Sequence, residues 1–180
     1  MHERDRVANL LGASALALTD LALSGATHAA GVTTSGAAAL VSLASSSGLS
    51  VTELGRRVGL SQPAASRLVD SLEADGLAER RRNPYGGRWM IIHATDAGRE
   101  TALRLLAARG DPLTEVVSVL DADECDQLSG LLEKLLTRVY ERVGEAQYIC
   151  RMCDKASCVA EPHECPVGAA ERAHGAEPSE

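Results

Sequence analysis

The chain has 180 residues, of which 45% are hydrophobic and 24% charged, and its formal net charge is −7. This composition excludes a disordered chain and provides apolar material for one core with an appendage. Aromatic residues make up only 2% and Phe is absent, which favours an aliphatic, mainly helical fold. The acidic total argues against indiscriminate binding to nucleic acid, although seven arginines against four acids make residues 56–92 locally basic.

The N-terminal segment predicts an amphipathic helix over residues 5–23. Its apolar side chains recur at helical spacing, with Ser14 as the one polar residue in the stripe. The segment superficially resembles a secretory signal, but "MHERDR" mixes acids with bases and Asp20 interrupts the apolar run. These features fit neither a signal peptide nor a membrane span. We therefore expect a cytoplasmic protein with no membrane partner.

The next segments predict a helix-turn-helix. A small loop at residues 25–34 is expected before a second helix, "SGAAALVSLASS". Ser50 and Glu53 have capping-box spacing for a short third helix that ends at Gly59. "QPAASRLVDSLEADGL" then predicts a fourth helix, with Pro63 in its first turn. Two short helices joined this tightly are typical of a helix-turn-helix.

After Gly76 the pattern changes to that of a β-hairpin. "LAERRR", the turn-rich "NPYGG" and "RWMIIHAT" predict two strands and their connection. A helical pattern follows over residues 96–120, with an expected bend at 110–112. Asp121 and Glu124 then form a capping box for another long helix. A helix-turn-helix followed by a hairpin is a winged helix. The apolar surface of the two long helices is more than such a small unit can bury, which predicts a homodimer.

Residues 50–100, "SVTELGRRVGLSQPAASRLVDSLEADGLAERRRNPYGGRWMIIHATDAGRE", resemble the DNA-reading core of the MarR (multiple antibiotic resistance regulator) family. The likeness extends over roughly residues 5–145, because the flanking helices fit that family's dimer. Its most specific part is "SRLVDSLEADGL", followed by the wing arginine Arg88 and by a Thr and a Gly that open the next helix. The sequence departs from the family at Gly86, where Asp is common, and at Ala94, where Leu is commoner.

The predicted DNA contacts follow from the position of the fourth helix. A recognition helix that enters the major groove by its N-terminal end presents its first turns to the base edges. Gln can bond adenine bidentately, Arg can bond guanine in the same way, and a small Ala leaves room for a thymine methyl. An exposed arginine run is usually only a solvated face, but arginines placed in a wing suit phosphates or a narrow minor groove. The predicted DNA-binding residues are Ser61, Gln62, Pro63, Ala64, Ser66, Arg67, Arg80, Arg81, Arg82 and Arg88.

Four cysteines near the end of the chain, Cys150, Cys153, Cys158 and Cys165, have the spacing C-x2-C-x4-C-x6-C. In a reducing compartment such a cluster indicates a metal or redox site rather than structural disulfides. Structural zinc commonly uses two close pairs, and only the first pair here has that spacing. A short cysteine run that ends before Pro166 is more similar to those that hold iron-sulfur clusters. We predict a [4Fe-4S] cluster on these four thiols, ahead of zinc, with a metal-free thiol-disulfide switch third.

Two neighbouring donors are left out of this ligand set. Cys125 falls on the apolar stripe of its helix and is expected to be a small buried hydrophobe. His163 stands alone in an acidic loop, where a histidine is more often exposed and unligated. The final "GAAERAHGAEPSE" predicts a disordered tail.

The expected fold is mainly α, a winged helix-turn-helix with a small β-hairpin wing and a helical dimerisation region. We divide the chain into an N-terminal dimerisation helix (residues 1–30), the DNA-binding domain (31–96), C-terminal dimerisation helices (97–145) and a cysteine-rich metal-binding loop with a flexible tail (146–180). The expected function is that of a homodimeric repressor whose binding to a double-stranded operator is modulated by the iron-sulfur cluster, as a redox or iron sensor.

Two other functions remain open. The MarR resemblance allows a regulator with a structural zinc and a small organic effector between the dimerisation helices and the DNA-binding heads. A thiol oxidoreductase using Cys150 and Cys153 is the alternative from another class, but its C-x-x-C lacks a βαβ context. No Ser-His-Asp or paired-carboxylate arrangement is evident, so we expect no enzyme.

Overall fold

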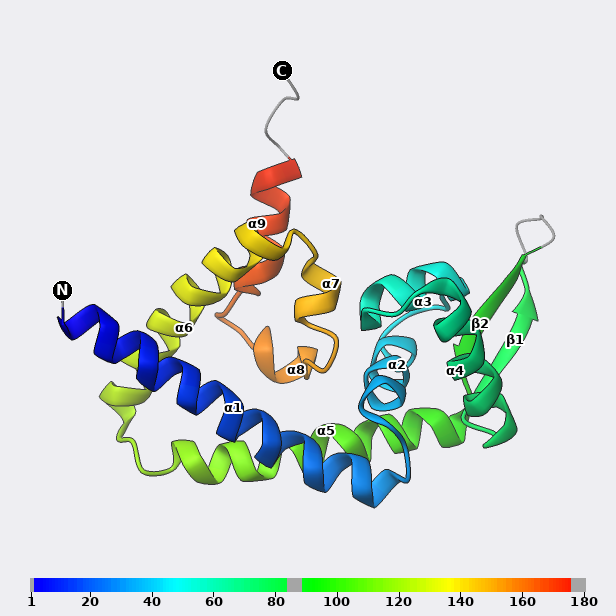
Figure 1. Ribbon diagram of the computed structural model, residues 1–180, viewed down its shortest axis with the longest axis horizontal. Coiled ribbons are helices and arrows are strands. Elements are labelled where there is room, and N and C mark those ends of the chain that lie inside the picture. Colours follow the sequence, from blue (N-terminus) through cyan, green and yellow to red (C-terminus); the bar gives the residue numbers. More distant parts are fainter. Residues whose placement is uncertain (1, 84–88, 176–180) are drawn as a thin grey trace.

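A computed structural model describes residues 2–83 and 89–175, apart from the side chains of residues 25, 26, 28 and 29 (Figure 1). The chain is mainly helical with one small antiparallel sheet, which confirms the predicted winged helix-turn-helix fold class. In chain order the elements are α1 (His2–Ala30), α2 (Thr34–Ala44), α3 (Val51–Val58), α4 (Gln62–Ala74), β1 (Ala78–Arg82), β2 (Met90–Ala94), α5 (Asp96–Val117), α6 (Ala122–Val143), α7 (Ala146–Ile149), α8 (Lys155–Cys158) and α9 (Pro166–Gly175).

The two long helices α1 and α5 lie side by side along one edge of the molecule (Figure 1). At one end of this pair, α2, α3, α4 and the hairpin form the head. At the other end, α6 turns back above α1 and α5. Residues 145–175, with α7, α8 and α9, fill the space between α6 and the head, and we call them the cysteine lobe.

The main core is aliphatic, as the composition predicts. Its largest fully buried side chains include Leu40, Leu54, Leu72, Ile92 and Leu105, which join α2, α3, α4, β2 and α5. A second, smaller core holds the cysteine lobe to α6. There Tyr140 of α6 packs with Ala146 and Val167.

The helix ends follow the capping signals in the sequence. The Ser50 hydroxyl accepts a hydrogen bond from the Glu53 amide at 3.1 Å, and α3 ends at Gly59 in the left-handed conformation (φ +74°). The predicted capping box of α6 is confirmed, because Asp121 and Glu124 exchange hydrogen bonds of 2.9 and 3.0 Å.

A third extended segment joins the hairpin to the helices of the head. β1 pairs with β2 in antiparallel register, with Ala78 opposite Ala94 and Arg82 opposite Met90. Leu49, which precedes α3, pairs with Ile92 through two backbone hydrogen bonds of 3.0 and 2.7 Å. Residues 84–88, which contain the predicted wing arginine Arg88, lie outside the described part of the chain.

Three local predictions are wrong, each where tertiary packing outweighs a local signal. α1 continues to Ala30 through much of the expected loop at 25–34, because its last turns pack along α5 and α2. α5 passes the expected bend with Pro112 inside the helix, supported by its contacts with α1. Residues 168–175 of the expected disordered tail belong to α9, because Val167 is buried in the small core with Tyr140, while residues 176–180 lie outside the described part of the chain.

Thr95 joins the start of α5 to the turn that follows α4. Its hydroxyl accepts from the Gly98 amide at 3.0 Å and donates to the Gly76 carbonyl at 2.7 Å. Replacing Thr95 by Ala removes both bonds, and we expect a loss of about 1 kcal/mol in the free energy of unfolding. Urea denaturation measures this loss, and Thr95→Ser should retain most of the stability. Equal stability of Thr95→Ala and wild type would contradict the capping role.

Candidate nucleic-acid interface and thiol cavity

The first turn of α4 combines an exposed polar face with a buried apolar one. Ala65, Val69 and Leu72 anchor the helix in the main core. On the other side, the predicted contacts Ser61, Gln62, Pro63 and Arg67 are exposed, while Ala64 and Ser66 are half-buried. Pro63 falls in the first turn, where its missing amide leaves no helical hydrogen bond unmade. The arrangement leaves the first turn of α4 accessible, so that it could enter a groove of DNA.

The arginines of the interface differ in how firmly they are held. Arg80 pairs with Asp70 at 2.7 Å and with Glu73, and its amide donates to Glu73 at 2.9 Å. Arg80 therefore fastens β1 to α4 and positions the recognition helix. Arg81 pairs with Glu79. Among the described residues Arg67 and Arg82 are exposed and have no ion-pair partner, which leaves their guanidinium groups available to phosphates or bases.

One exposed aromatic side chain beside the wing had no place in the sequence-based interface. Trp89, the residue before β2, is 60% exposed, and Met90 next to it is also exposed. The available signal was that this is the single Trp of the chain, within a basic hairpin.

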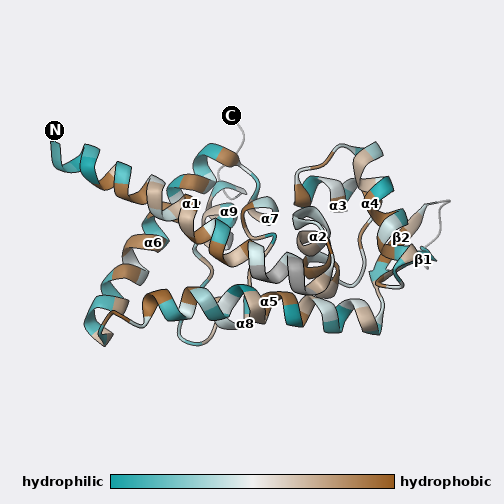
Figure 2. Ribbon diagram, turned by 60° about the horizontal axis from the view of Figure 1, so that its bottom comes forward, coloured by the Kyte–Doolittle hydropathy of each residue, from teal (hydrophilic) through white to brown (hydrophobic). Residues whose placement is uncertain are grey.

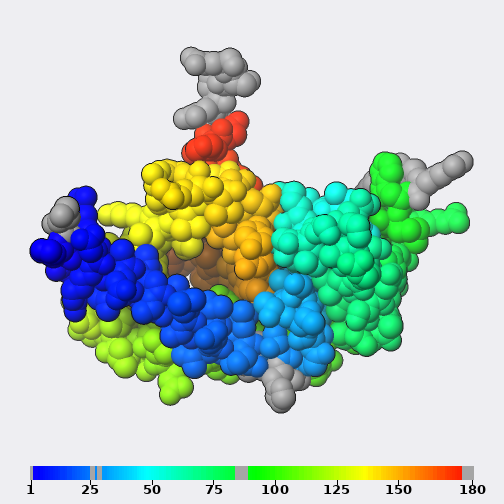
Figure 3. All heavy atoms as spheres, viewed as in Figure 1, coloured from blue at the N-terminus to red at the C-terminus, as the bar shows by residue number. Residues whose placement is uncertain are grey.

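The four cysteines of the predicted ligand set line one cavity of about 830 Å³. Its other walls come from α1, α5 and α6, with Leu18, Ala22, Arg109 and Leu136 among them. Figure 3 shows the molecule hollowed between α1, α6 and the cysteine lobe. Cys125 and His163 are not part of this wall, and Cys125, which was expected to be buried, is only half-buried.

The thiols of the cavity interact with one another. The Cys153 thiol donates a hydrogen bond to Cys150, which lowers the pKa of Cys150 and raises that of Cys153. Burial raises the pKa of Cys158 to about 11, with neighbouring Cys153 and Cys165 adding to the effect. The Cys165 sulfur accepts from the Gly168 amide at 3.4 Å, at the start of α9. All four thiols are free rather than paired in disulfides.

The thiols surround a space rather than closing on a point. In residues 2–83 and 89–175, no three Cys, His, Asp or Glu side chains are arranged to hold one metal ion as they stand. A mononuclear site with sulfurs about 2.3 Å from the metal is therefore not preformed. The donors nevertheless suit a soft metal or cluster, because four thiols line the cavity, beside one carboxylate, that of Asp154.

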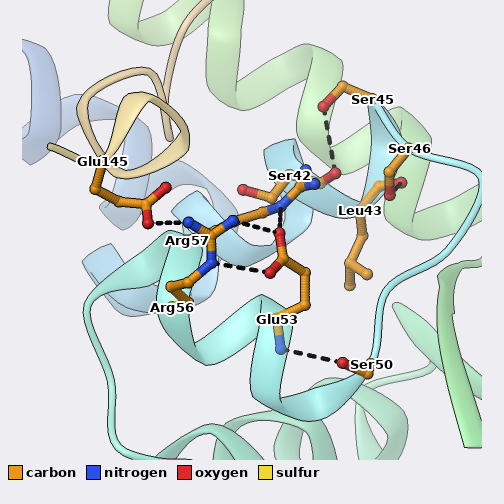
Figure 4. A network of polar contacts seen from close by, with 9 residues as sticks. All are labelled: Ser42, Leu43, Ser45, Ser46, Ser50, Glu53, Arg56, Arg57 and Glu145. Carbon is orange, nitrogen blue, oxygen red and sulfur yellow. Dashed lines mark hydrogen bonds and ion pairs between the residues drawn. The ribbon is translucent and has the colours of Figure 1, made fainter. Parts of the chain in front are cut away.

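A network of ion pairs on α3 links the head to the cysteine lobe (Figure 4). Glu53 accepts hydrogen bonds from Arg56 at 2.8 and 2.9 Å and from Arg57 at 2.7 Å. The bond from Arg56 is the main reason that the pKa of Glu53 falls to about 2. Arg56 also pairs with Glu145, which precedes α7. No sequence signal predicted this link, because the two residues lie 89 positions apart.

The fold and the exposed helix α4 define a winged-helix protein, and comparison with known proteins shows which family this region resembles. Residues 30–88 match the sequence model of the MarR family. The chain is 33% identical over 103 residues to the transcriptional repressor MprA of Escherichia coli, which covers 56% of this chain and 58% of that protein. It thus spans less than two thirds of the curated relatives that it matches first.

Solved structures agree with this assignment. The YusO protein of Bacillus subtilis is similar with a TM-score of 0.64 and 25% identity, over 74% of this chain and 94% of that chain. A MarR family protein of Bacillus stearothermophilus gives a TM-score of 0.69 at 23% identity, over 77% and 98% of the two chains. The head therefore resembles the MarR family in sequence and has its fold. The named relatives are transcriptional regulators rather than enzymes.

The Glu53 carboxylate generates a pH-dependent prediction. Because its pKa in the folded chain lies below the ordinary 4.5, its contribution to stability is present above about pH 4.5 and is lost as the pH falls towards 2. Glu53→Gln should lower the free energy of unfolding by roughly 1 kcal/mol at pH 7. The difference from wild type should shrink as the pH is lowered through 4.5.

Urea denaturation at pH 7, 5 and 3.5 measures this dependence. Glu100→Gln is the matched control, because its ion pair with Arg104 is largely exposed and spans 3.7 Å. That variant should match wild type at every pH. A constant difference between Glu53→Gln and wild type over this range would show that the ion pairs of Glu53 are not its cause.

Proposed function

We propose that the chain is a cytoplasmic, homodimeric transcriptional regulator, and specifically a repressor, that binds a double-stranded operator through α4 and the hairpin. The observation that carries this proposal is Arg67, which is exposed and has no ion-pair partner among the described residues, on a helix whose opposite face is buried in the core. The MarR match and the relative named a transcriptional repressor support it. Two α4 helices in a dimer would read half-sites about one helical turn apart.

Exposed apolar side chains support the dimer. They lie along α1 and α6, the helices in which Figure 2 shows hydrophobic residues in brown among hydrophilic ones in teal. They include Val7, Leu10, Leu11, Leu131, Leu132 and Leu135. His2–Ser24 of α1 is also long and apolar enough to cross a membrane by length and composition alone. A second copy accounts better for both faces, because α1 packs along α5 and the relatives are named transcriptional regulators.

We further propose that Cys150, Cys153, Cys158 and Cys165 hold a [4Fe-4S] cluster that modulates operator binding in response to redox state or iron. Four sulfur donors around one cavity support an iron-sulfur cluster. Arg109 and Arg151 also line the cavity, where their positive charge would offset that of a thiolate-ligated cluster.

The alternative regulator holds a structural zinc and binds a small organic effector. The size of the cavity supports this alternative, because 830 Å³ is within the range of small-molecule sites. Apolar side chains of α1 and α5, such as Leu18, Ala22 and Leu113, would face the effector. A thiol-disulfide switch between Cys150 and Cys153 needs no metal and rests on their direct hydrogen bond.

The recognition helix is tested by Arg67→Ala. We expect the variant to lose about 1–3 kcal/mol of binding free energy for an operator duplex selected from random DNA, with the dimer intact. Fluorescence anisotropy measures the affinity, and sedimentation measures the dimer. Arg104→Ala on α5 is the control and should bind as wild type does. Unchanged binding by Arg67→Ala would refute the assigned recognition helix.

The cluster is tested by anaerobic purification with metal and sulfide analysis. We expect about four iron and about four sulfide per chain and a brown colour. Cys158→Ser should lose most of the iron, while Cys125→Ser on α6 should keep it because Cys125 is not part of the cavity wall. A colourless protein with about one zinc per chain would overturn the cluster and favour the alternative regulator.

A further inference from the structure

The cysteine lobe touches the turn of the helix-turn-helix. Tyr148 of α7 lies against Gly59, the left-handed residue between α3 and α4. A Cβ atom added to Gly59 would come within 2.6 Å of Cε2 of the Tyr148 ring. The ring therefore packs directly on the backbone of the turn, in the space that a side chain would otherwise occupy. Arg151 covers the same ring with its guanidinium carbon 4.2 Å from the ring centroid.

A second contact lies one helical turn earlier on α3. Arg56 reaches from α3 to Glu145, and its other donors are occupied by Glu53. In the described part of the chain, the second oxygen of Glu145 is buried without a hydrogen-bond partner. A buried carboxylate oxygen in this state is costly unless the facing cation stays in place. The ion pair therefore favours one position of the lobe relative to α3.

The contact residues alternate with the first two ligand cysteines along the chain. Tyr148 stands two residues before Cys150, and Met152 stands directly before Cys153. Met152 is buried in the main core and, together with both thiols, also lines the cavity. Residues 153–156 also lie beside α2 and α5, around a smaller hollow. Whatever orders these thiols must also order the side chains that touch the head.

We infer that the cysteine lobe is a clamp on the helix-turn-helix, and that the state of the four thiols is transmitted to α4 through Tyr148 and Glu145. The inference rests on the proposed function, since it names how the thiol site would regulate DNA binding. With the thiols held together, α7 keeps Tyr148 on Gly59 and the turn is ordered. With the thiols released or modified, α7 loses this position, and the two states of the turn differ in affinity for DNA.

Hydrogen exchange of the full-length dimer tests the clamp. We expect the amides of residues 55–64 to exchange more slowly with the thiol site loaded than after metal removal. In Tyr148→Ala they should exchange fast in both states, and in Glu145→Gln the difference should be reduced. Tyr148→Phe keeps the ring and should behave as wild type does. Glu164→Gln is a second control, because its pair with Arg172 lies within the lobe.

Operator affinity gives the functional readout on the same samples. Wild type should change its affinity between the loaded and emptied states by a factor of roughly 5 to 150, the usual range of coupling between sites. Tyr148→Ala should bring this ratio to about one without loss of iron. Protected amides at residues 55–64 in Tyr148→Ala, or an unchanged affinity ratio in that variant, would overturn the clamp. If Tyr148→Ala does not form a folded dimer, Glu145→Gln decides by the same two measurements.

Iron and sulfide analysis of the same samples separates this inference from the proposed cluster. If wild type holds no iron, the thiols are loaded with zinc or alkylated with N-ethylmaleimide, and the exchange of residues 55–64 is compared again. A response that is present in wild type and absent in Tyr148→Ala would support the clamp even though the iron-sulfur proposal fails. No response in wild type to any of these treatments would overturn the clamp as well.

Discussion

The DNA-reading head depends on the pairing of Leu49 with Ile92. Two backbone hydrogen bonds join the segment before α3 to β2, and the Ile92 side chain is fully buried among the leucines of α2, α3 and α4. This single residue thus belongs both to the hairpin and to the helical core. Because the core is close-packed, the hairpin and α4 have one arrangement relative to each other. Arg80 adds a polar fastening on the outer side through Asp70 and Glu73.

The local features of the fold could be predicted from the sequence because their causes are local. Caps such as Ser50 and Asp121 act within three residues, and the apolar stripe of α4 repeats within one helix. The errors at residues 25–34, Pro112 and 168–175 share one physical reason. There the composition favours a loop, a bend or disorder, but packing against a distant helix stabilises the helix. Such packing has no signal in a window of neighbouring residues.

In the candidate sites, too, features with a local sequence signal could be predicted and contacts between distant residues could not. The spacing of the cysteines predicted which thiols line the cavity, because four soft donors in a short segment are themselves a chemical signal. The contacts from Arg56 to Glu145 and from Gly59 to Tyr148 join segments far apart in sequence, and each side chain alone is ordinary. Arg80, Arg81 and Arg82 look equivalent in the sequence, and only the structure separates the paired Arg80 and Arg81 from Arg82. Arg88 remains a prediction outside the described residues.

Gly59 carries a consequence for how this regulator can change by mutation. The left-handed turn alone would tolerate Asn, a common substitute for Gly at the end of a helix. With the Tyr148 ring in place, any side chain at this position must displace the lobe. The cysteine lobe therefore restricts one position of the head, residue 59, to glycine. If the cysteine lobe were lost, a residue with a side chain could replace Gly59. A lobe in this position could be acquired only by a chain that already had glycine there.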